Sequence, residues 1–145
     1  PMGLACRQPY RQAESTSFQA GLQRVNLVSK ESRKVSGRQQ KQAFPPNFVH
    51  SLDAAHMAMT AELAHKQGIS FAAVHDSYWC HARDIDTLNS CIREAFIDMY
   101  SQPILERVRA DFISVLGEHG LEIPKLPPVG DLDIEKVRDS PFFFH

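Results

Sequence analysis

The chain has 145 residues, of which 43% are hydrophobic and 23% charged, and its formal net charge is −1. This composition is typical of a globular domain with a sizeable core, and it excludes a low-complexity chain. No apolar run approaches the roughly 20 residues that a membrane-spanning helix needs, so we expect no membrane insertion. The sequence begins at Pro1 without a signal-peptide pattern, and we expect the chain to be a fragment of a longer protein.

The net charge conceals an uneven distribution along the chain. Residues 1–46 carry eight Lys and Arg against two Glu, a net charge of +6, whereas residues 47–145 carry eight against fifteen acidic residues, a net charge of −7. The basic segment either contacts nucleic-acid phosphates or forms a solvated face, and the sequence leaves both open. Its cations are Arg7, Arg11, Arg24, Lys30, Arg33, Lys34, Arg38 and Lys41.

Cysteine and histidine spacing excludes several kinds of site. The three cysteines are an odd number without a Cys-x-x-Cys motif, which argues against a disulfide framework and a zinc site and fits a reducing compartment. The seven histidines contain no His-Glu-x-x-His motif. His50 and His56 are six residues apart and would point to different sides of a helix, so they are not a metal-binding pair.

In chain order, the first third offers few strong signals. Residues 1–21 contain scattered Pro and Gly and are expected to be irregular or to form short strands. The partial alternation of residues 22–28 predicts a strand. Residues 29–42 form a polar, basic loop, which is either a mobile nucleic-acid contact or a solvated connection.

A helix is predicted next. Pro45-Pro46 should fix an extended entry and Asn47 is a favourable N-cap, so the helix should begin near Phe48 and run to about Lys66, with Gly68 as its stop. His50 would then sit in the first turn, off the apolar stripe. The stripe that should face the core contains Phe48, Leu52, Ala55, Met59 and Leu63.

The stretch around residues 69–82 predicts a β-hairpin. Two short apolar and aromatic runs flank His75-Asp76-Ser77, which suit a tight turn, so Asp76 should be presented at the tip. Such a carboxylate is either a ligand for Mg²⁺, which prefers oxygen donors, or a residue bonded to its own turn backbone. Tyr78 and Trp79 alternate in facing, so one should pack inward and the other outward.

Two helices and an extended end complete the chain. Asp84 or Asp86 can cap a helix with the stripe Ile85, Leu88, Ile92, Phe96 and Met99, and Pro103 begins another with the stripe Leu105, Val108, Phe112 and Leu116. Both stripes are interpreted as core scaffolding. A proline-rich loop follows, residues 132–137 are expected to form one or two helical turns, and the aromatic residues 142–144 must pack somewhere.

Four stretches together resemble the single-subunit, bacteriophage-type RNA polymerases, and in particular their mitochondrial branch. His75-Asp76-Ser77-Tyr78-Trp79 resembles the metal-binding palm hairpin of that family, and residues 46–51 resemble the start of the preceding helix. The terminal residues 142–145 resemble its aromatic C-terminus, and Pro9-Tyr10-Arg11 also matches. The resemblance implies an α+β, helix-rich fold that is part of a right-hand polymerase. It would comprise a basic segment (1–46), a helix–hairpin–helix–helix core (47–119) and a C-terminal extension (120–145).

The resemblance also implies a function. Asp76 would be one of two carboxylates that bind Mg²⁺, His75 would position it or contact the primer-side backbone, and a second carboxylate would lie earlier, outside this chain. His50 would test the ribose 2′-hydroxyl, and Tyr78 would contact substrate or pack. The partners would be a DNA template, the RNA product, ribonucleoside triphosphates and transcription initiation factors, in a mitochondrion or alternatively a plastid.

Two other functions stay open at this point. A family A DNA polymerase also carries a His-Asp pair on its palm hairpin, although an acidic residue usually follows where Ser77 stands here. The other alternative is a non-catalytic nucleic-acid-binding relic that keeps the hairpin without the rest of the enzyme.

Overall fold

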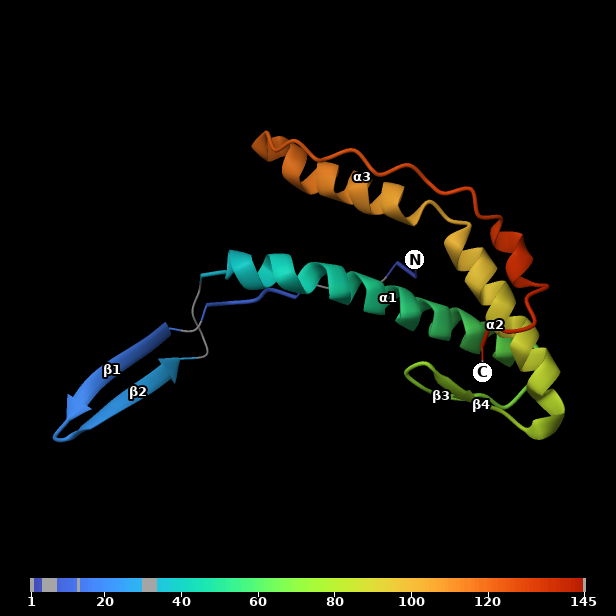
Figure 1. The fold of residues 1–145 in the computed structure, drawn as a ribbon, viewed down its shortest axis with the longest axis horizontal. Coiled ribbons are helices and arrows are strands. Elements are labelled where there is room, and N and C mark those ends of the chain that lie inside the picture. Colours follow the sequence, from blue (N-terminus) through green and yellow to red (C-terminus); the bar gives the residue numbers. More distant parts are fainter. Residues whose placement is uncertain (1, 4–7, 13, 30–33, 145) are drawn as a thin grey trace. The chain divides into compact units, whose positions relative to one another are not determined.

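The computed structural model describes residues 2–3, 8–12, 14–29 and 34–144. The chain divides into two compact units, one of residues 3–51 and the other of residues 52–145 together with residues 1–2. Figure 1 shows the helices and strands of both units. The division falls inside the long helix α1, which spans Gly37–Lys66.

The unit of residues 3–51 contains an antiparallel hairpin. Strand β1, Glu14–Ala20, pairs along its whole length with strand β2, Gln23–Ser29. Gly21 begins the two-residue turn with a φ of 63°, a conformation that glycine adopts without steric cost. The strand predicted at residues 22–28 is confirmed, and the segment before it supplies the partner strand.

Helix α1 begins at Gly37, so the predicted start near Phe48 and the extended entry at Pro45-Pro46 are wrong. Both prolines lie inside the helix, where each removes one main-chain hydrogen bond. Two local signals favour the earlier start. The six residues after Gly37 are Arg, Gln, Lys and Ala, all strong helix formers. In addition, the Ser36 hydroxyl accepts a hydrogen bond from the backbone N–H three residues later, at 3.4 Å.

Side chains before and after the two prolines also bind one neighbouring segment. Gln40 Oε1 accepts a hydrogen bond from the Tyr10 backbone N–H at 3.1 Å, and Gln40 Nε2 donates to the Gln8 carbonyl at 3.2 Å. Asn47 Nδ2 donates to the Tyr10 hydroxyl at 2.8 Å and to the Gln8 side chain. Asn47, predicted as an N-cap, therefore lies within the helix and ties it to residues 8–10.

In the unit of residues 52–145, α1 ends where the sequence predicts. Gly68 has a φ of 70° and its N–H donates to the His65 carbonyl at 3.0 Å, which closes the last turn at Lys66. The buried face is shifted by one residue from the predicted stripe, of which only Ala55 is buried. The buried residues of α1 are Ala55, His56, Thr60 and Ala64.

Helix α2, Ile85–Tyr100, supplies most of the core and follows a short 3₁₀ turn, η1, at Ala82–Asp84. Its predicted stripe is confirmed in the middle, whereas Ile85 is 56% exposed. Asp84 occupies the N-cap position, but its side chain makes no capping hydrogen bond. The buried residues of α2 are Leu88, Cys91, Ile92, Ala95, Ile97 and Met99.

Helix α3, Ile104–Leu116, is followed by a 3₁₀ turn, η2, at Gly117–His119, and it has no buried residue among those the structure describes. Its predicted stripe is therefore not core, and Leu105 is 46% exposed. Arg109 donates hydrogen bonds to the carbonyls of Ile123 and Pro124, which hold the extended loop along α3.

A last 3₁₀ turn, η3, at Ile134–Val137 confirms the predicted helical turn. The described residues thus form helices with two small sheets, which confirms a helix-rich α+β class. Among all helices of the described residues, none has both the length and the apolar character that crossing a membrane requires.

Candidate active site

The predicted metal ligand lies at the tip of the second hairpin. Strand β3, Ala72–Val74, pairs with strand β4, Ser77–Trp79, so that His75 and Asp76 form a two-residue turn (Figure 1). His75 has a φ of 55°, a left-handed conformation that is unusual for a residue other than glycine and that tight hairpin turns demand. The predicted hairpin is confirmed, with Ser77 as the first residue of β4 and not part of the turn.

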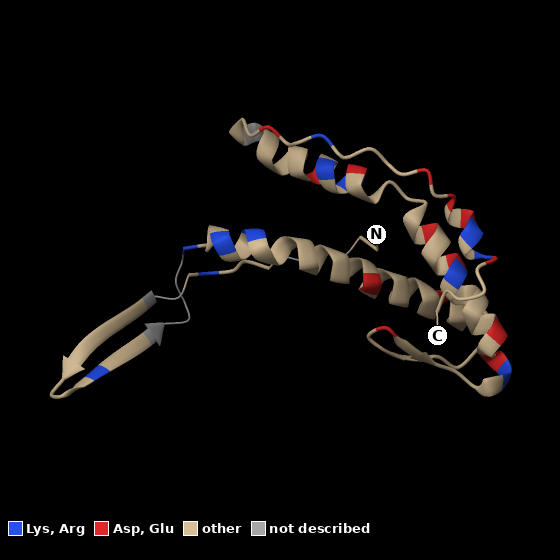
Figure 2. Ribbon diagram, viewed as in Figure 1, with Lys and Arg blue, Asp and Glu red and all other residues tan. Residues whose placement is uncertain are grey.

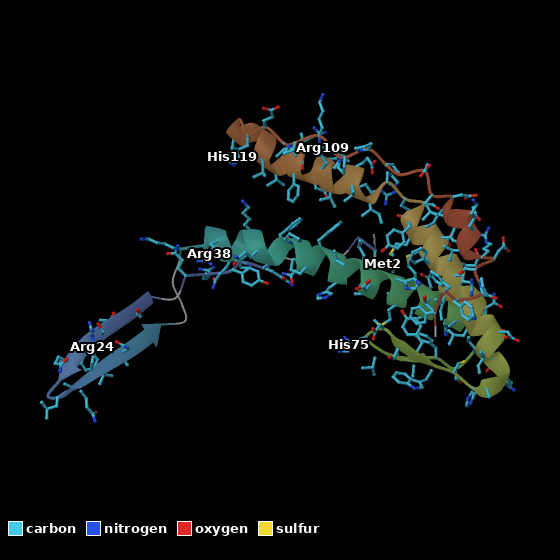
Figure 3. The ribbon with its side chains drawn as sticks, in the orientation of Figure 1. Met2, Arg24, Arg38, His75, Arg109 and His119 are labelled. Carbon is cyan, nitrogen blue, oxygen red and sulfur yellow. The ribbon has the colours of Figure 1, made fainter. Side chains whose placement is uncertain are left out.

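The turn presents its side chains to solvent. His75 and Asp76 are both exposed, and Figure 3 shows His75 at the outer end of the hairpin. An exposed carboxylate suits Mg²⁺, which takes one or two protein carboxylates and fills its remaining positions with water and phosphate oxygens. Across the described residues, no three His, Cys, Asp or Glu side chains are grouped to hold a metal ion. Asp76 is therefore a candidate for one metal ligand, and its binding of Mg²⁺ stays a prediction.

The two aromatic residues of β4 face opposite ways, as the sequence predicts. Tyr78 is half-buried, and its ring centroid lies 5.1 Å from that of Phe144 in a stacked arrangement and 5.3 Å from that of Phe71. Trp79 is 53% exposed. Tyr78, two residues after Asp76, therefore packs the inner face of the hairpin against these rings. A contact between Tyr78 and the substrate stays a prediction.

Two carboxylates act on the Tyr78 phenol. Burial is the main reason that the pKa of Tyr78 is raised above its ordinary value, and the negative charges of Asp53 and Asp76 raise it further. Burial, followed by the charge of Asp53, likewise raises the pKa of Tyr100. The negative charge of Asp53, on α1, therefore contributes to the raised pKa of both phenols.

Of the aromatic residues 142–144, which the sequence predicts to pack, only Phe143 and Phe144 do so, against α2 and the hairpin. Phe144 stacks on Tyr78, and the Phe143 ring centroid lies 4.9 Å from that of Phe96. Phe142 is 86% exposed and takes no part in this packing. His145, the last residue of the predicted aromatic end, lies outside the described residues.

Two arginines bind the segment that precedes these rings to α2. Arg93, on α2, donates to the carbonyl oxygens of Val137 and Arg138, and its guanidinium lies 5.5 Å from the Phe143 ring centroid. Arg138 in turn forms a two-pronged ion pair with Glu94, with N–O distances of 2.7 and 2.8 Å. This pair holds the pKa of Glu94 below its ordinary value. Residues 137–143 are therefore bound to α2 by charge as well as by ring packing.

His50 lies in the other unit. It is exposed on α1, and because α1 begins at Gly37, His50 is not in the first helical turn as the sequence predicts. Its predicted contact with the ribose stays a prediction.

The basic segment also belongs to the unit of residues 3–51. Figure 2 shows Lys and Arg on β2 and on the first turns of α1. Arg24, Arg38 and Lys41 are exposed there, and Figure 3 shows the side chains of Arg24 and Arg38. Arg7, Lys30 and Arg33 lie outside the described residues, as does Cys6. The exposed cations leave both the nucleic-acid contact and the solvated face open.

Sequence reasoning missed two residues of this region. His56 is buried between the hairpin, α2 and the C-terminal rings, and Asp53 acts on Tyr78. Both lie beside the predicted apolar stripe of α1. The signal that could have found His56 is its position next to Ala55, one helical turn before Thr60, on the face that packs most closely.

Comparison with known proteins assigns this chain to a family. A family model described as DNA-dependent RNA polymerase matches residues 1–120. The chain belongs to the DNA-dependent RNA polymerase family. It is 47% identical over 145 residues to DNA-directed RNA polymerase 2, chloroplastic/mitochondrial, of Arabidopsis thaliana, and it covers 14% of that protein. It is 46% identical to DNA-directed RNA polymerase 1A of Nicotiana tabacum, of which it covers 92%.

A further relative shows the same relation. DNA-directed RNA polymerase 1, mitochondrial, of Arabidopsis thaliana is 44% identical over the whole chain, which again spans 14% of its length. The resemblance seen in the sequence to phage-type RNA polymerases is thereby confirmed. Family membership also decides against the DNA polymerase alternative.

Proposed function

We propose that this chain is the palm-hairpin portion of a right-hand, single-subunit RNA polymerase that copies DNA into RNA, and that Asp76 is a ligand of its catalytic Mg²⁺. One observation carries the proposal. Asp76 stands exposed at the tip of a hairpin whose inner face is packed against rings from the C-terminal segment and α1. This arrangement combines an open carboxylate with a fixed support, which a metal ligand needs.

The chemistry of nucleotide addition is phosphoryl transfer. Bound Mg²⁺ would hold the attacking and leaving oxygens in line and neutralise the charge that develops on them. Asp76 would bind the metal through its carboxylate, and the packing of Tyr78 would hold the turn in a fixed position. The second carboxylate of the two-metal site would come from a part of the polymerase that this chain does not include.

The partners follow from the same proposal. A DNA template, the RNA product and ribonucleoside triphosphates would be bound by the complete enzyme, with transcription initiation factors as further partners. The exposed cations of the unit 3–51 support contact with nucleic-acid phosphates. The relatives are named as mitochondrial or chloroplastic/mitochondrial enzymes, which supports an organellar location, in mitochondria or in plastids.

Substitution of the metal ligand tests the proposal. We would replace the matching segment of the Arabidopsis relative that is 47% identical with residues 1–145 and compare the chimera with its Asp76→Asn variant. The change removes a ligand charge with almost no change of shape, so RNA synthesis should fall by more than about tenfold, or ~1.4 kcal/mol of transition-state stabilisation, with template binding retained. Asp86→Asn, an exposed acid on α2, is the control. An Asp76→Asn chimera that keeps more than about a tenth of the rate contradicts the metal-ligand role. The chain alone should not synthesise RNA.

His50 is proposed to select the sugar of the incoming nucleotide. An imidazole that meets the ribose 2′-hydroxyl affects the choice of substrate more than the chemical step. In the chimera, His50→Ala should therefore lower the ratio of kcat/KM for ribo- over deoxyribonucleotides, whereas His65→Ala, another exposed histidine of α1, should not. An unchanged ratio in His50→Ala would leave His50 as a surface residue.

The charge of the unit 3–51 favours a second candidate, a module that binds nucleic acid without catalysis. Binding of the 145-residue chain to duplex DNA should then weaken steeply with salt, and the double substitution Arg38→Gln, Lys41→Gln should reduce the slope by about two. This candidate becomes the better one if the chain binds DNA while the chimera with intact Asp76 makes no RNA.

A further inference from the structure

His56 is one of two buried polar residues among those the structure describes, and it is 8% exposed. Its Nε2 lies 2.9 Å from the main-chain carbonyl oxygen of Ile92 on α2. A carbonyl oxygen only accepts hydrogen bonds, so Nε2 carries the hydrogen and donates it. The carbonyl has two lone pairs and can accept this bond beside its bond within the helix. The ring of His56 is thereby fixed in rotation against α2.

The fixed ring touches three other parts of the unit. Its centroid lies 5.8 Å from that of Phe96 and 6.4 Å from that of Phe144, both edge-on, and 6.5 Å from that of Tyr78. These separations are within the range in which aromatic pairs attract each other. One imidazole therefore joins α1 to α2, to the C-terminal segment and to β4.

The path from His56 to the turn is short. Tyr78 is stacked between the ring of Phe144 and the edge of Phe71, and it pairs with Ala73 across the hairpin. Asp76 is two residues before Tyr78 in the same short hairpin. The packing of Tyr78 against Phe144, Phe71 and His56 therefore supports the turn from its inner face.

Stability alone does not explain a histidine at this position. Phenylalanine would make the same ring contacts, and it would avoid the cost of removing a polar ring from water. The hydrogen bond to Ile92 offsets that cost, and it adds one property that an apolar ring lacks, a fixed orientation. A histidine at this position therefore supplies orientation as well as packing.

We propose that His56 is a positioning residue for the metal-binding turn: through its bond to Ile92 and its contacts with Phe144 and Tyr78, it holds Asp76 at the place where Mg²⁺ is bound. This inference rests on the proposed function of Asp76. His56 itself touches neither metal nor substrate. A displacement of about 1 Å at a reacting centre can cost on the order of 10²-fold in rate, so loss of the bond should be felt at the turn.

His56→Phe is the direct test, because it keeps a ring and removes the donor. In the purified chain, the amides of residues 74–79 should exchange with deuterium roughly fivefold faster, the equivalent of about 1 kcal/mol for one hydrogen bond. Exchange in the centre of α2 should not change. His65→Phe, an exposed histidine on the same helix, is the matched control and should leave both regions unchanged. Equal acceleration in the hairpin and α2 would show a general loss of stability and would overturn the proposal.

Activity gives the second readout. In the chimera, His56→Phe should lower kcat about tenfold and raise the Mg²⁺ concentration for half-maximal rate, with KM for nucleotides unchanged. His56→Gln, which keeps a donor and loses the ring, covers the case in which His56→Phe does not fold, and it should show the same pattern. A normal rate and normal Mg²⁺ dependence in the folded variant refute the inference. If Asp76→Asn also stays active, the proposed function fails; if only the His56 variants are normal, the inference alone fails.

Discussion

The two hairpins of this chain differ in how far their side chains are packed against other residues. The β1–β2 hairpin has seven paired positions, yet its described side chains from residue 15 to residue 27 are all exposed except Val25, which is half-buried. The β3–β4 hairpin has only three paired positions, but Tyr78 on its inner face contacts the rings of Phe71, His56 and Phe144.

The difference shows where the rigidity of the candidate site comes from. An isolated two-stranded hairpin is marginally stable in water, whatever its length, because its pairing replaces hydrogen bonds that water already supplies. Packing of one face is what adds stability. The shorter hairpin should thus be the more rigid one, and it is the one that carries the carboxylate.

The largest effect is expected from removing the ring that lies on Tyr78. Phe144→Ala deletes a half-buried aromatic side chain, and we expect the β3–β4 amides to exchange roughly tenfold faster, since a fully buried ring contributes about 3–5 kcal/mol. Hydrogen exchange of the purified chain measures this directly. In the chimera, deletion of residues 142–145 should lower kcat even at temperatures at which the shortened protein remains folded.

Two controls keep this prediction specific. Phe142→Ala removes a ring that is 86% exposed and should have no effect on the hairpin. Phe18→Ala, on β1, should leave β3–β4 unchanged. If Phe142→Ala and Phe144→Ala act equally, packing on Tyr78 is not what holds the turn.

Both turns should be more stable with glycine at their left-handed position, so introducing glycine in one and removing it from the other should have opposite effects. His75→Gly relieves a left-handed residue, worth about 1–2 kcal/mol, against an entropy loss of about 0.5–1 kcal/mol, so β3–β4 should exchange about threefold more slowly. Gly21→Ala imposes the same strain on β1–β2, where an added Cβ meets no atom within 4 Å, and should speed exchange by a similar factor. If Gly21→Ala leaves amide exchange unchanged, β1–β2 opens so often that the added strain does not alter its exchange rate.

The smallest effect is a dependence on alkaline pH. The pKa values of Tyr78 and Tyr100 are raised above 10.0, so their neutral forms are favoured in the folded chain. Their contribution to the free energy of unfolding is complete below pH 10 and is lost as the pH rises through the raised values. Trp79, the sole tryptophan, lies in β4 and its fluorescence follows unfolding. The double variant Tyr78→Phe, Tyr100→Phe should show a shallower decline above pH 10, and an identical decline would contradict this assignment.

Local sequence signals predict two features of the site. The tight turn at Asp76 and the stop at Gly68 each follow from a few adjacent residues whose conformational preferences are strong. The prediction for the start of α1 is wrong because Pro45-Pro46 indicate a later start, whereas Ser36 and the run of helix formers behind it favour the observed one. Propensity is a weak guide wherever contacts such as Asn47 with Tyr10 can outweigh it.

The rest depends on contacts between distant residues. A periodic stripe shows that a helix has an apolar face but not what covers it, which is why α3 was expected in the core and is instead exposed. His56 escaped notice for the same reason. Its partners Ile92 and Phe144 are far away in the sequence, and its place beside Ala55 and one turn before Thr60 shows only that it lies on the small-residue face of α1, not what covers that face.

The ring cluster also fixes the order in which the chain can assemble. A hairpin such as β1–β2 closes within microseconds once its residues are available, because its contacts are local. The support of Asp76 needs residues 56, 78, 96 and 144 together, so during synthesis from the N-terminus the turn stays unsupported until Phe144 has left the ribosome. A nascent chain stalled before Phe143 would carry every predicted site residue and still lack a finished site.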